Sequence, residues 1–279
     1  MNSTRFIFFS IIFSVCSSLV FSQTAKNRDV PITDELSNFI DCFYNNELQT
    51  LAKAKALYSD CITSIPEVFD EYQKAVHLAR CDFYFGMYTM GEYDFDSVQN
   101  IKSMTDTSDN QKNLSEQAKQ RKAKAASYFD KAIDLADKAL KIRSGSDAYL
   151  IKTMALSSNC TVKNTGYIIR NGLSVGSLAK KAINKDELNA TAHYYQYAQD
   201  LYAPAFFANY KNGLKKMKEF NASTTLRKEK FDHYFFITGM AYGYYKLNDK
   251  ANALKCYKEA LKIYPGNHFA IKMVNELSE

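Results

Sequence analysis

The chain has no tryptophan and few of the residues that break regular structure, with 10 glycines and 4 prolines in 279 residues. A protein rich in β-sheet needs a tight turn roughly every ten residues, and such turns usually contain glycine or proline. The shortage of both argues against a sheet-rich fold and favours long helices. With 46% apolar residues the chain can still form a sizeable core, in which 20 tyrosines and 19 phenylalanines must supply the aromatic packing.

The sequence also lacks the short motifs that identify common catalytic and cofactor sites. It contains no H-E-x-x-H metal motif, no Walker phosphate loop and no dinucleotide-binding fingerprint. One acidic stretch does not have the spacing of an EF-hand calcium loop, although it contains Asp94, Asp96, Asp106 and Asp109. We therefore expect no enzyme activity, no cofactor and no bound metal.

One short segment does fit a catalytic pattern. Residues 172–176 read GLSVG, and G-x-S-x-G in α/β-hydrolases places a serine, here Ser174, on a turn between a strand and a helix. That turn requires a parallel sheet, and an acid and a histidine downstream. No strand pattern is convincing, and His193, His233 and His268 fall in or at the start of predicted helices. We interpret GLSVG as a closely packed helix face, or as a helix N-terminus with free N–H groups for an anion.

The first 22 residues are typical of a secretory signal peptide. A basic start precedes an unbroken run of apolar and small residues, and Val20 and Ser22 occupy the −3 and −1 positions of a cleavage site after Ser22. We expect an exported protein, periplasmic or secreted. Two alternatives stay open: the run is retained as an anchor, although it is short for a membrane span, or Cys16 is lipidated.

Removal of this segment leaves a net charge of +5 and five cysteines. An odd number of cysteines without C-x-x-C spacing argues against a disulfide framework, but one bridge between neighbouring helices stays open, for instance Cys42 to Cys61. The lysines alternate with acidic residues and do not cluster. We therefore do not expect nucleic acid as a partner.

The most informative segment is residues 234–267, in which two helical patterns meet at a short polar turn. In the second helix Ala253, Tyr257 and Ala260 share a face, and Pro265 ends the helix. Small residues at this spacing let two antiparallel helices approach closely, and the aromatic ring fills the groove beside them. The segment resembles a tetratricopeptide repeat (TPR), a helix–turn–helix unit of about 34 residues with the same small, aromatic and proline positions.

The first helix of this segment matches the family less closely. Tyr244 falls on the family's tyrosine, Ala241 stands where glycine is usual, and Ile237 replaces the usual tryptophan. Upstream, three alanines repeat the second-helix spacing: Ala132, Ala136 and Ala139. The resemblance therefore implies further, eroded repeats before the good one.

An earlier first helix is predicted to end in the family's Gly-x-Tyr turn at Gly91 and Tyr93. The polar residues 94–115 that follow predict an inserted loop, mobile or facing a partner. Helical patterns run along the rest of the chain, at 33–46, 48–63, 67–90, 116–143, 147–157, 167–184, 190–203, 206–219, 228–247, 250–263 and 268–278.

These patterns predict an all-α fold. The TPR resemblance implies a right-handed α-solenoid of antiparallel helix pairs over residues 32–279, after a flexible linker at 23–31. The best repeat is 234–267, and the amphipathic end, 268–279, is expected to cap the solenoid.

A TPR superhelix is lined on its concave side by first helices, which usually bind an extended peptide or a helix of another protein. The resemblance places five residues on that side: Phe235, Thr238, Tyr242, Tyr245 and Lys246. A lysine among aromatic rings suits a ligand that combines a carboxylate with apolar side chains. Packing in the core stays open as the alternative role of Phe235 and Tyr242.

Residues 193–220 resemble a segment of the helical T-component lipoproteins of TRAP transporters. Tyr202, Pro204 and Phe207 carry the resemblance, whereas Ala208 and Asn209 stand where two glycines are expected. Tyr202 therefore joins the candidate partner-binding residues. The favoured prediction is an exported scaffold that binds a peptide or protein in an aromatic-lined groove. The alternative is a periplasmic accessory protein of solute uptake, a possible transporter component, with membrane contact that is peripheral at most.

Overall fold

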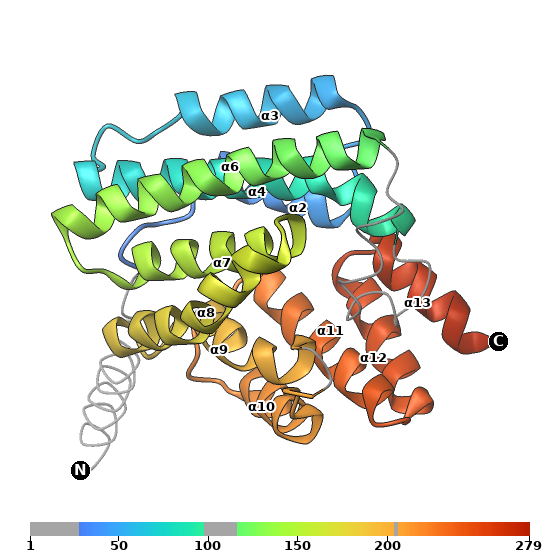
Figure 1. Cartoon of the computed structure of the whole chain (residues 1–279). Helices are drawn as coiled ribbons and strands as arrows, with labels where there is room; N and C mark the ends of the chain where they lie inside the picture. The colour runs from blue at the N-terminus through green and yellow to red at the C-terminus, as the bar shows by residue number, and fades with distance from the viewer. Residues whose placement is uncertain (1–27, 98–115, 204–205) are drawn as a thin grey trace, which may run out of the picture.

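The computed structural model describes residues 28–97, 116–203 and 206–279, which form eleven α-helices and no β-strand (Figure 1). In chain order the helices are α2 (Asp34–Tyr44), α3 (Leu51–Thr63), α4 (Glu71–Ser97), α6 (Glu116–Ile142), α7 (Ser146–Val162), α8 (Thr165–Lys185), α9 (Ala190–Tyr202), α10 (Tyr210–Ala222), α11 (Lys230–Lys246), α12 (Lys250–Ile263) and α13 (His268–Ser278). The all-α prediction is confirmed, and each predicted helix has a counterpart. The predicted signal peptide, residues 1–22, lies outside the described residues.

Polar caps define where many of the helices begin. The side chain of the capping residue accepts a hydrogen bond from a backbone N–H of the first turn, which would otherwise lack a partner inside the helix. Eight helices start in this way, after Thr33, Thr50, Asp70, Asn164, Asn189, Asn209, Asp249 and Asn267. These capping hydrogen bonds therefore define most of the helix starts among the described residues.

Small residues on the inner helix faces allow the close packing that the sequence predicts. Ala253, Tyr257 and Ala260 of α12 are fully buried, and so are the three upstream alanines of α6. Between α11 and α12 the chain turns at Asn248, whose φ of 64° lies in the left-handed region that asparagine tolerates. The predicted helix–turn–helix at 234–267 is confirmed as local structure.

The predicted end of α4 is wrong. The helix continues through Gly91 and Tyr93 to Ser97, so these residues form no Gly-x-Tyr turn and the first four residues of the predicted loop 94–115 are helical. Polar sequence alone does not end a helix when no proline or capping signal interrupts it. Close packing of α4 on α6 runs along this pair of helices, and a Cβ atom at Gly86 would lie 2.8 Å from the ring of Phe129 in α6. Residues 98–115 lie outside the described part of the chain.

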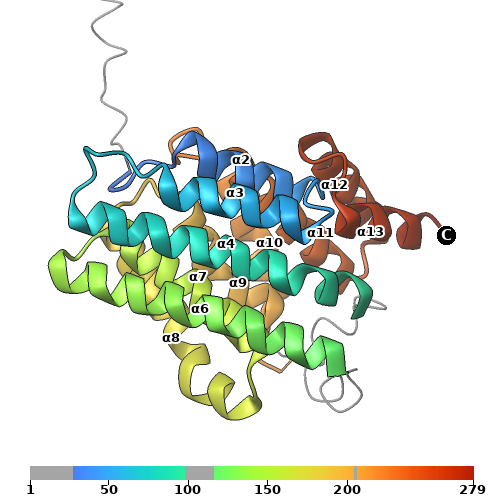
Figure 2. The same ribbon diagram turned by 90° about the horizontal axis from the view of Figure 1, so that it is seen from above.

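The helices are arranged in layers. Figure 1 shows α3, α4 and α6 across the top, α8, α9 and α10 below them, and α11, α12 and α13 at one end. Viewed from above in Figure 2, α3, α4 and α6 run as nearly parallel rows over α7, α9 and α10. From α6 to α13 each helix packs on the next one in the chain.

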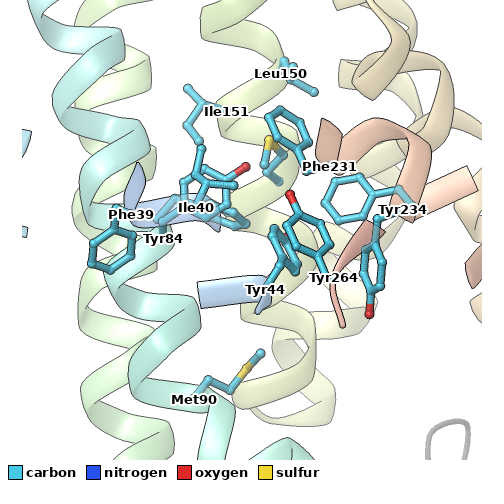
Figure 3. Packing of buried hydrophobic residues seen from close by; sticks show 14 of the residues in the cluster. Phe39, Ile40, Tyr44, Tyr84, Met90, Leu150, Ile151, Phe231, Tyr234 and Tyr264 are labelled. Atoms are coloured by element: carbon cyan, nitrogen blue, oxygen red, sulfur yellow. The ribbon is translucent and has the colours of Figure 1, made fainter. Parts of the chain in front are cut away.

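The first described helix, α2, packs against α11 and the residues that follow α12. The ring of Tyr44 lies 5.4 Å from the rings of both Tyr234 and Tyr264, measured between centroids (Figure 3). The side-chain amide of Asn267 donates a 2.8 Å hydrogen bond to the carbonyl of Tyr44, and the backbone N–H of Gly266 donates one to the side chain of Asn45. These contacts join the two ends of the described chain.

The segment before α2 is packed as well, which corrects the prediction of a flexible linker at 23–31 for its described part, residues 28–31. The backbone N–H of Val30 donates a 2.8 Å hydrogen bond to Asp147, and its carbonyl accepts one of 2.8 Å from Arg80. Arg80 and Asp147 also form a buried ion pair with an N–O distance of 2.8 Å. Because buried charges and backbone groups need partners, this network fixes the segment in place.

Candidate partner-binding site

Three of the predicted groove residues lie in the interior. Phe235, Thr238 and Tyr242 are 8%, 7% and 1% exposed. The ring of Phe235 stacks on Tyr194 of α9 at 5.0 Å and meets Tyr44 of α2 edge-on at 5.6 Å. The groove prediction is therefore wrong for these three residues, and core packing, the alternative for Phe235 and Tyr242, is what the structure shows. The reason is that α2 and α9 cover this side of α11.

The remaining predicted residues are partly exposed, towards one end of α9 and α11. Tyr202, the last residue of α9, stacks on the buried Tyr242 with 4.8 Å between the ring centroids and 29° between the ring planes. The ammonium of Lys246 lies 5.7 Å from the ring of Tyr242 and 5.5 Å from that of Tyr210. Tyr245, beside Lys246 in the chain, is partly exposed too. The structure thus places Tyr202 in an aromatic cluster, and the cation beside that cluster is the ammonium of Lys246.

Tyr202 and its neighbour Tyr194 are neutral phenols. Burial raises the pKa of Tyr202 well above its ordinary value, and a hydrogen bond joins its hydroxyl to that of Tyr194, whose pKa burial also raises. A phenol in this state offers a ring face and a hydroxyl group but no negative charge. The charge that a partner meets here is therefore the positive charge of Lys246.

Next to Tyr202, the connection between α9 and α10 exposes two large aromatic side chains. Phe206 is 91% exposed and Phe207 is 74% exposed, and their rings meet edge-on with centroids 5.2 Å apart. Isolated exposed apolar residues are ordinary, but two adjacent phenylalanines that leave most of their surface in water are not. This pair, which we call the Phe206–Phe207 tip, is the most exposed aromatic feature among the residues that the structure describes.

The two helices between which the tip stands, α9 and α10, are tied to each other. The backbone N–H of Asn209 donates a 2.9 Å hydrogen bond to the carbonyl of Asp200, and the side chain of Asn212 donates one of 2.6 Å to the Asp200 carboxylate. Asn209 also caps α10. Because α9 and α10 are tied together immediately behind it, the tip is presented from a defined position. Pro204, which carries part of the T-component resemblance, lies outside the described residues.

Two further apolar side chains are exposed on α8, the neighbour of α9. Ile169 and Leu173 are 74% and 89% exposed and lie one helical turn apart on the same face. The two helices meet where the side chain of Gln199 in α9 donates a 3.1 Å hydrogen bond to the carbonyl of Gly172 in α8. The exposed part of α8 therefore adjoins the end of α9 from which the tip extends.

Ser174 lies inside α8, which begins at Thr165 and ends at Lys185. A serine in the middle of a helix is not at a strand-to-helix turn, so the hydrolase elbow is not formed. The alternative of a helix N-terminus at GLSVG is also wrong. The interpretation as a close-packing face holds for Gly176, where a Cβ atom would lie 2.7 Å from the Gln199 side chain, but not for Gly172, whose nearest neighbour is 3.8 Å away in the same helix.

The interior contains a small cavity lined in part by two arginines and a tyrosine, Arg28, Arg80 and Tyr84. Its volume of about 20 Å³ is room for about one water molecule. Both arginines already have carboxylate partners, Asp232 for Arg28 and Asp147 for Arg80. We therefore assign this cavity to the packed interior and not to a ligand site.

No group of three or more histidine, cysteine, aspartate or glutamate side chains among the described residues is arranged to hold a metal ion. Within 28–97, 116–203 and 206–279, no helix combines the length and the apolar character that crossing a membrane requires. Of the four predicted loop aspartates, Asp94 and Asp96 belong to the last turn of α4, and Asp106 and Asp109 lie outside the described residues.

Sequence reasoning missed the tip, although a signal for it was present. Two adjacent phenylalanines stand between the helix end at Tyr202 and the capping residue Asn209, in a connection too short to fold back over them. Loops of this length run on the surface, so both rings had to be exposed unless another element covered them.

The chain matches no protein family, no curated protein and no solved structure.

Proposed function

We propose that this protein is an exported scaffold, a right-handed solenoid of TPR-like helix pairs, that binds a protein or peptide partner. The fully buried alanines of α6 and α12 and the packing of each helix on the next support the repeat architecture. The contact site is the Phe206–Phe207 tip with Tyr202 and Lys246 behind it. It replaces the predicted groove on α11, whose central residues are buried.

The observation that carries this proposal is the exposure of Phe206 and Phe207 between two helices that hydrogen bonds tie to each other. Moving one phenylalanine side chain from water into an apolar interface contributes about 1.5–3 kcal/mol. Interfaces obtain most of their binding energy from a few such anchors. The tip offers two of them side by side.

The chemistry of the surface indicates the chemistry of the partner. Lys246 stands over the aromatic cluster and Lys211 is exposed in the first turn of α10, directly after the tip. A matching partner segment presents a hydrophobic pocket or apolar side chains to the phenylalanines, with a carboxylate nearby for the lysines. The solute-uptake alternative requires a chamber of ligand size, and the cavity beside Arg28 holds about one water molecule.

Photo-crosslinking tests the proposal. Benzoylphenylalanine at position 207 replaces one exposed aromatic by another, and the protein is irradiated in its own cell envelope. The matched control carries the same residue at Val68, which is 88% exposed in the connection between α3 and α4. We expect one protein to be attached at position 207 and not at position 68. That protein, once purified, must also bind the wild-type chain in solution.

Two outcomes would count against the scaffold. The same set of adducts at positions 207 and 68 would mean that the tip contacts proteins non-specifically. No adduct at position 207, together with a small molecule that co-purifies in the native mass spectrum, would favour solute uptake instead.

A further inference from the structure

Helices α3 and α4 are locked in register beside each other. The hydroxyl of Tyr58 in α3 donates a 2.6 Å hydrogen bond to Asp82 in α4, and its ring lies 4.5 Å from the ring of Phe85. Cys61 is one turn after Tyr58, and Cys81 directly precedes Asp82. The register therefore places the two cysteines opposite each other.

The two thiols are in contact in the interior. Cys61 and Cys81 are 1% and 2% exposed, and a hydrogen bond joins the Cys81 thiol to the sulfur of Cys61. His77, one turn before Cys81, closes the group: its Nε2 lies 2.8 Å from the carbonyl oxygen of Cys61 and 3.5 Å from Sγ of Cys81. His77 thus bridges the backbone of Cys61 and the thiol of Cys81, beside the contact between the two sulfurs.

Cys42, the partner considered for Cys61 from the sequence, faces other groups. Its sulfur lies 3.7 Å from the side-chain oxygen of Asn38 and 3.5 Å from the carboxylate of Glu47. The fold therefore favours pairing of Cys61 with Cys81 over pairing with Cys42.

We propose that Cys61 and Cys81 form a disulfide bond, with a disulfide compound of an oxidising compartment as the oxidant. One cysteine thiolate attacks the oxidant's disulfide. This attack forms a mixed disulfide between the protein and the oxidant, and it releases the first sulfur of the oxidant as a thiol. The second cysteine thiolate then attacks the protein sulfur and releases the second thiol. The protein loses two protons and two electrons, and the oxidant is reduced from one disulfide to two thiols. This inference rests on the export that the proposed function includes and not on the proposed partner.

The surroundings indicate when the bond forms. The hydrogen bond to Cys61 and burial raise the pKa of the Cys81 thiol, so the packed pair contains little of the thiolate that reacts. Burial also lowers the pKa of His77, which leaves its ring neutral, with Nε2–H donating to the Cys61 carbonyl. Oxidation therefore takes place during folding, before α3 settles on α4. Once formed, the buried bond is protected from reductants.

The bond has a clear structural task. Of the residues in α3, only Ala54 and Cys61 are buried, so α3 is held to the rest of the molecule by a narrow strip. A bridge to Cys81 closes a loop of about 20 residues and removes much of the freedom of that loop in the unfolded chain. It anchors a helix that contributes only two buried residues to the apolar core.

The test is to denature and reduce the full chain, refold it in a buffer of reduced and oxidised glutathione, and block free thiols with N-ethylmaleimide in denaturant. Intact mass should show two fewer blocked cysteines than a sample reduced with dithiothreitol. A tryptic digest should contain the peptide with Cys61 linked to the peptide with Cys81. The melting temperature of the oxidised protein should exceed that of the reduced protein by about 5–10 °C.

Three variants make the result decisive. Cys61→Ser and Cys81→Ser should each abolish the loss of two thiols and the reductant-sensitive shift in melting temperature, while Cys42→Ser should retain both. Circular dichroism checks that each variant is helical, and Cys61→Ala replaces Cys61→Ser if the buried hydroxyl prevents folding. Full blocking of all cysteines in the refolded wild type, or a linked peptide that contains Cys42, would overturn the proposal.

Discussion

The hydroxyl of Tyr264, one residue after α12 ends, donates a 2.8 Å hydrogen bond to the carboxylate of Asp41 in α2 across 223 residues of sequence. The ring of the same tyrosine packs on Tyr44, and the ammonium of Lys230 lies 4.5 Å from its centroid. This one side chain therefore connects the first described helix to the end of α12. Its removal should loosen the closure of the molecule.

We predict that Tyr264→Phe lowers the free energy of unfolding by about 1–2 kcal/mol, because it removes a hydrogen bond to a charged group but keeps the ring. The matched control is Tyr257→Phe, since the buried hydroxyl of Tyr257 has no hydrogen-bond partner within the described parts of the chain. That change should be neutral or slightly stabilising. Urea unfolding of both variants measures the difference, and equal destabilisation would contradict the assignment.

Asp232 should make stability depend on pH. Burial raises the pKa of Asp232 to about 6, although the charge of Arg28 and a hydrogen bond from Thr191 lower it. In the unfolded chain the pKa is about 3.9. The folded state therefore holds this proton more tightly, so the stabilisation is fully present below about pH 4 and is lost as the pH rises through about 6.

The comparison that isolates this group is wild type against Asp232→Asn, because other titrating groups are common to both. We expect the stability of the wild type relative to the variant to fall by about 2 kcal/mol between pH 4 and pH 7. Chemical unfolding at several pH values provides the measurement. A difference that is constant across this range, or that grows with pH, would refute the raised pKa.

A glycine in α10 and a glycine in α8 should respond in opposite ways to an added methyl group. A Cβ atom at Gly213 of α10 would lie 2.7 Å from the fully buried side chain of Leu201, whereas one at Gly172 of α8 meets nothing closer than 3.8 Å. We predict that Gly213→Ala costs about 1–3 kcal/mol through overpacking. Gly172→Ala should be neutral or stabilise by up to about 1 kcal/mol, because alanine is the better helix former. Melting curves of the two variants test the contrast.

The Phe206–Phe207 tip should matter for binding and not for folding. Changing Phe206 and Phe207 together to serine removes no buried contact, so the free energy of unfolding should stay within about 0.5 kcal/mol of the wild type. Affinity for the crosslinked partner should fall at least tenfold, with Val68→Ser as the surface control. Calorimetric titration measures the affinity. If the double variant binds as well as the wild type, the tip is not the contact site.

Much of the local structure followed from the sequence, because its causes are local. Asparagine, threonine and aspartate caps, the proline at 265 and the scarcity of glycine define helices within the segments that contain them. Alanine spacing likewise predicted the close packing of Ala253 and Ala260, which are fully buried. The end of α4 was misplaced because its polar residues carry no stop signal, and pairing with α6 extends close packing along that helix.

The candidate site could not be read from the sequence in the same way. Helix α11 is apolar on nearly every side, so no periodicity separates a groove-facing Tyr242 from a buried one. What the sequence determined by itself is an all-helical chain and the capped starts of many helices, since hydrogen bonds and side-chain volumes a few residues apart decide both. Only the tertiary structure decided which aromatic residues are exposed. Packing of α2 and α9 on α11 buries Phe235 and Tyr242, while no described element covers Phe206 and Phe207.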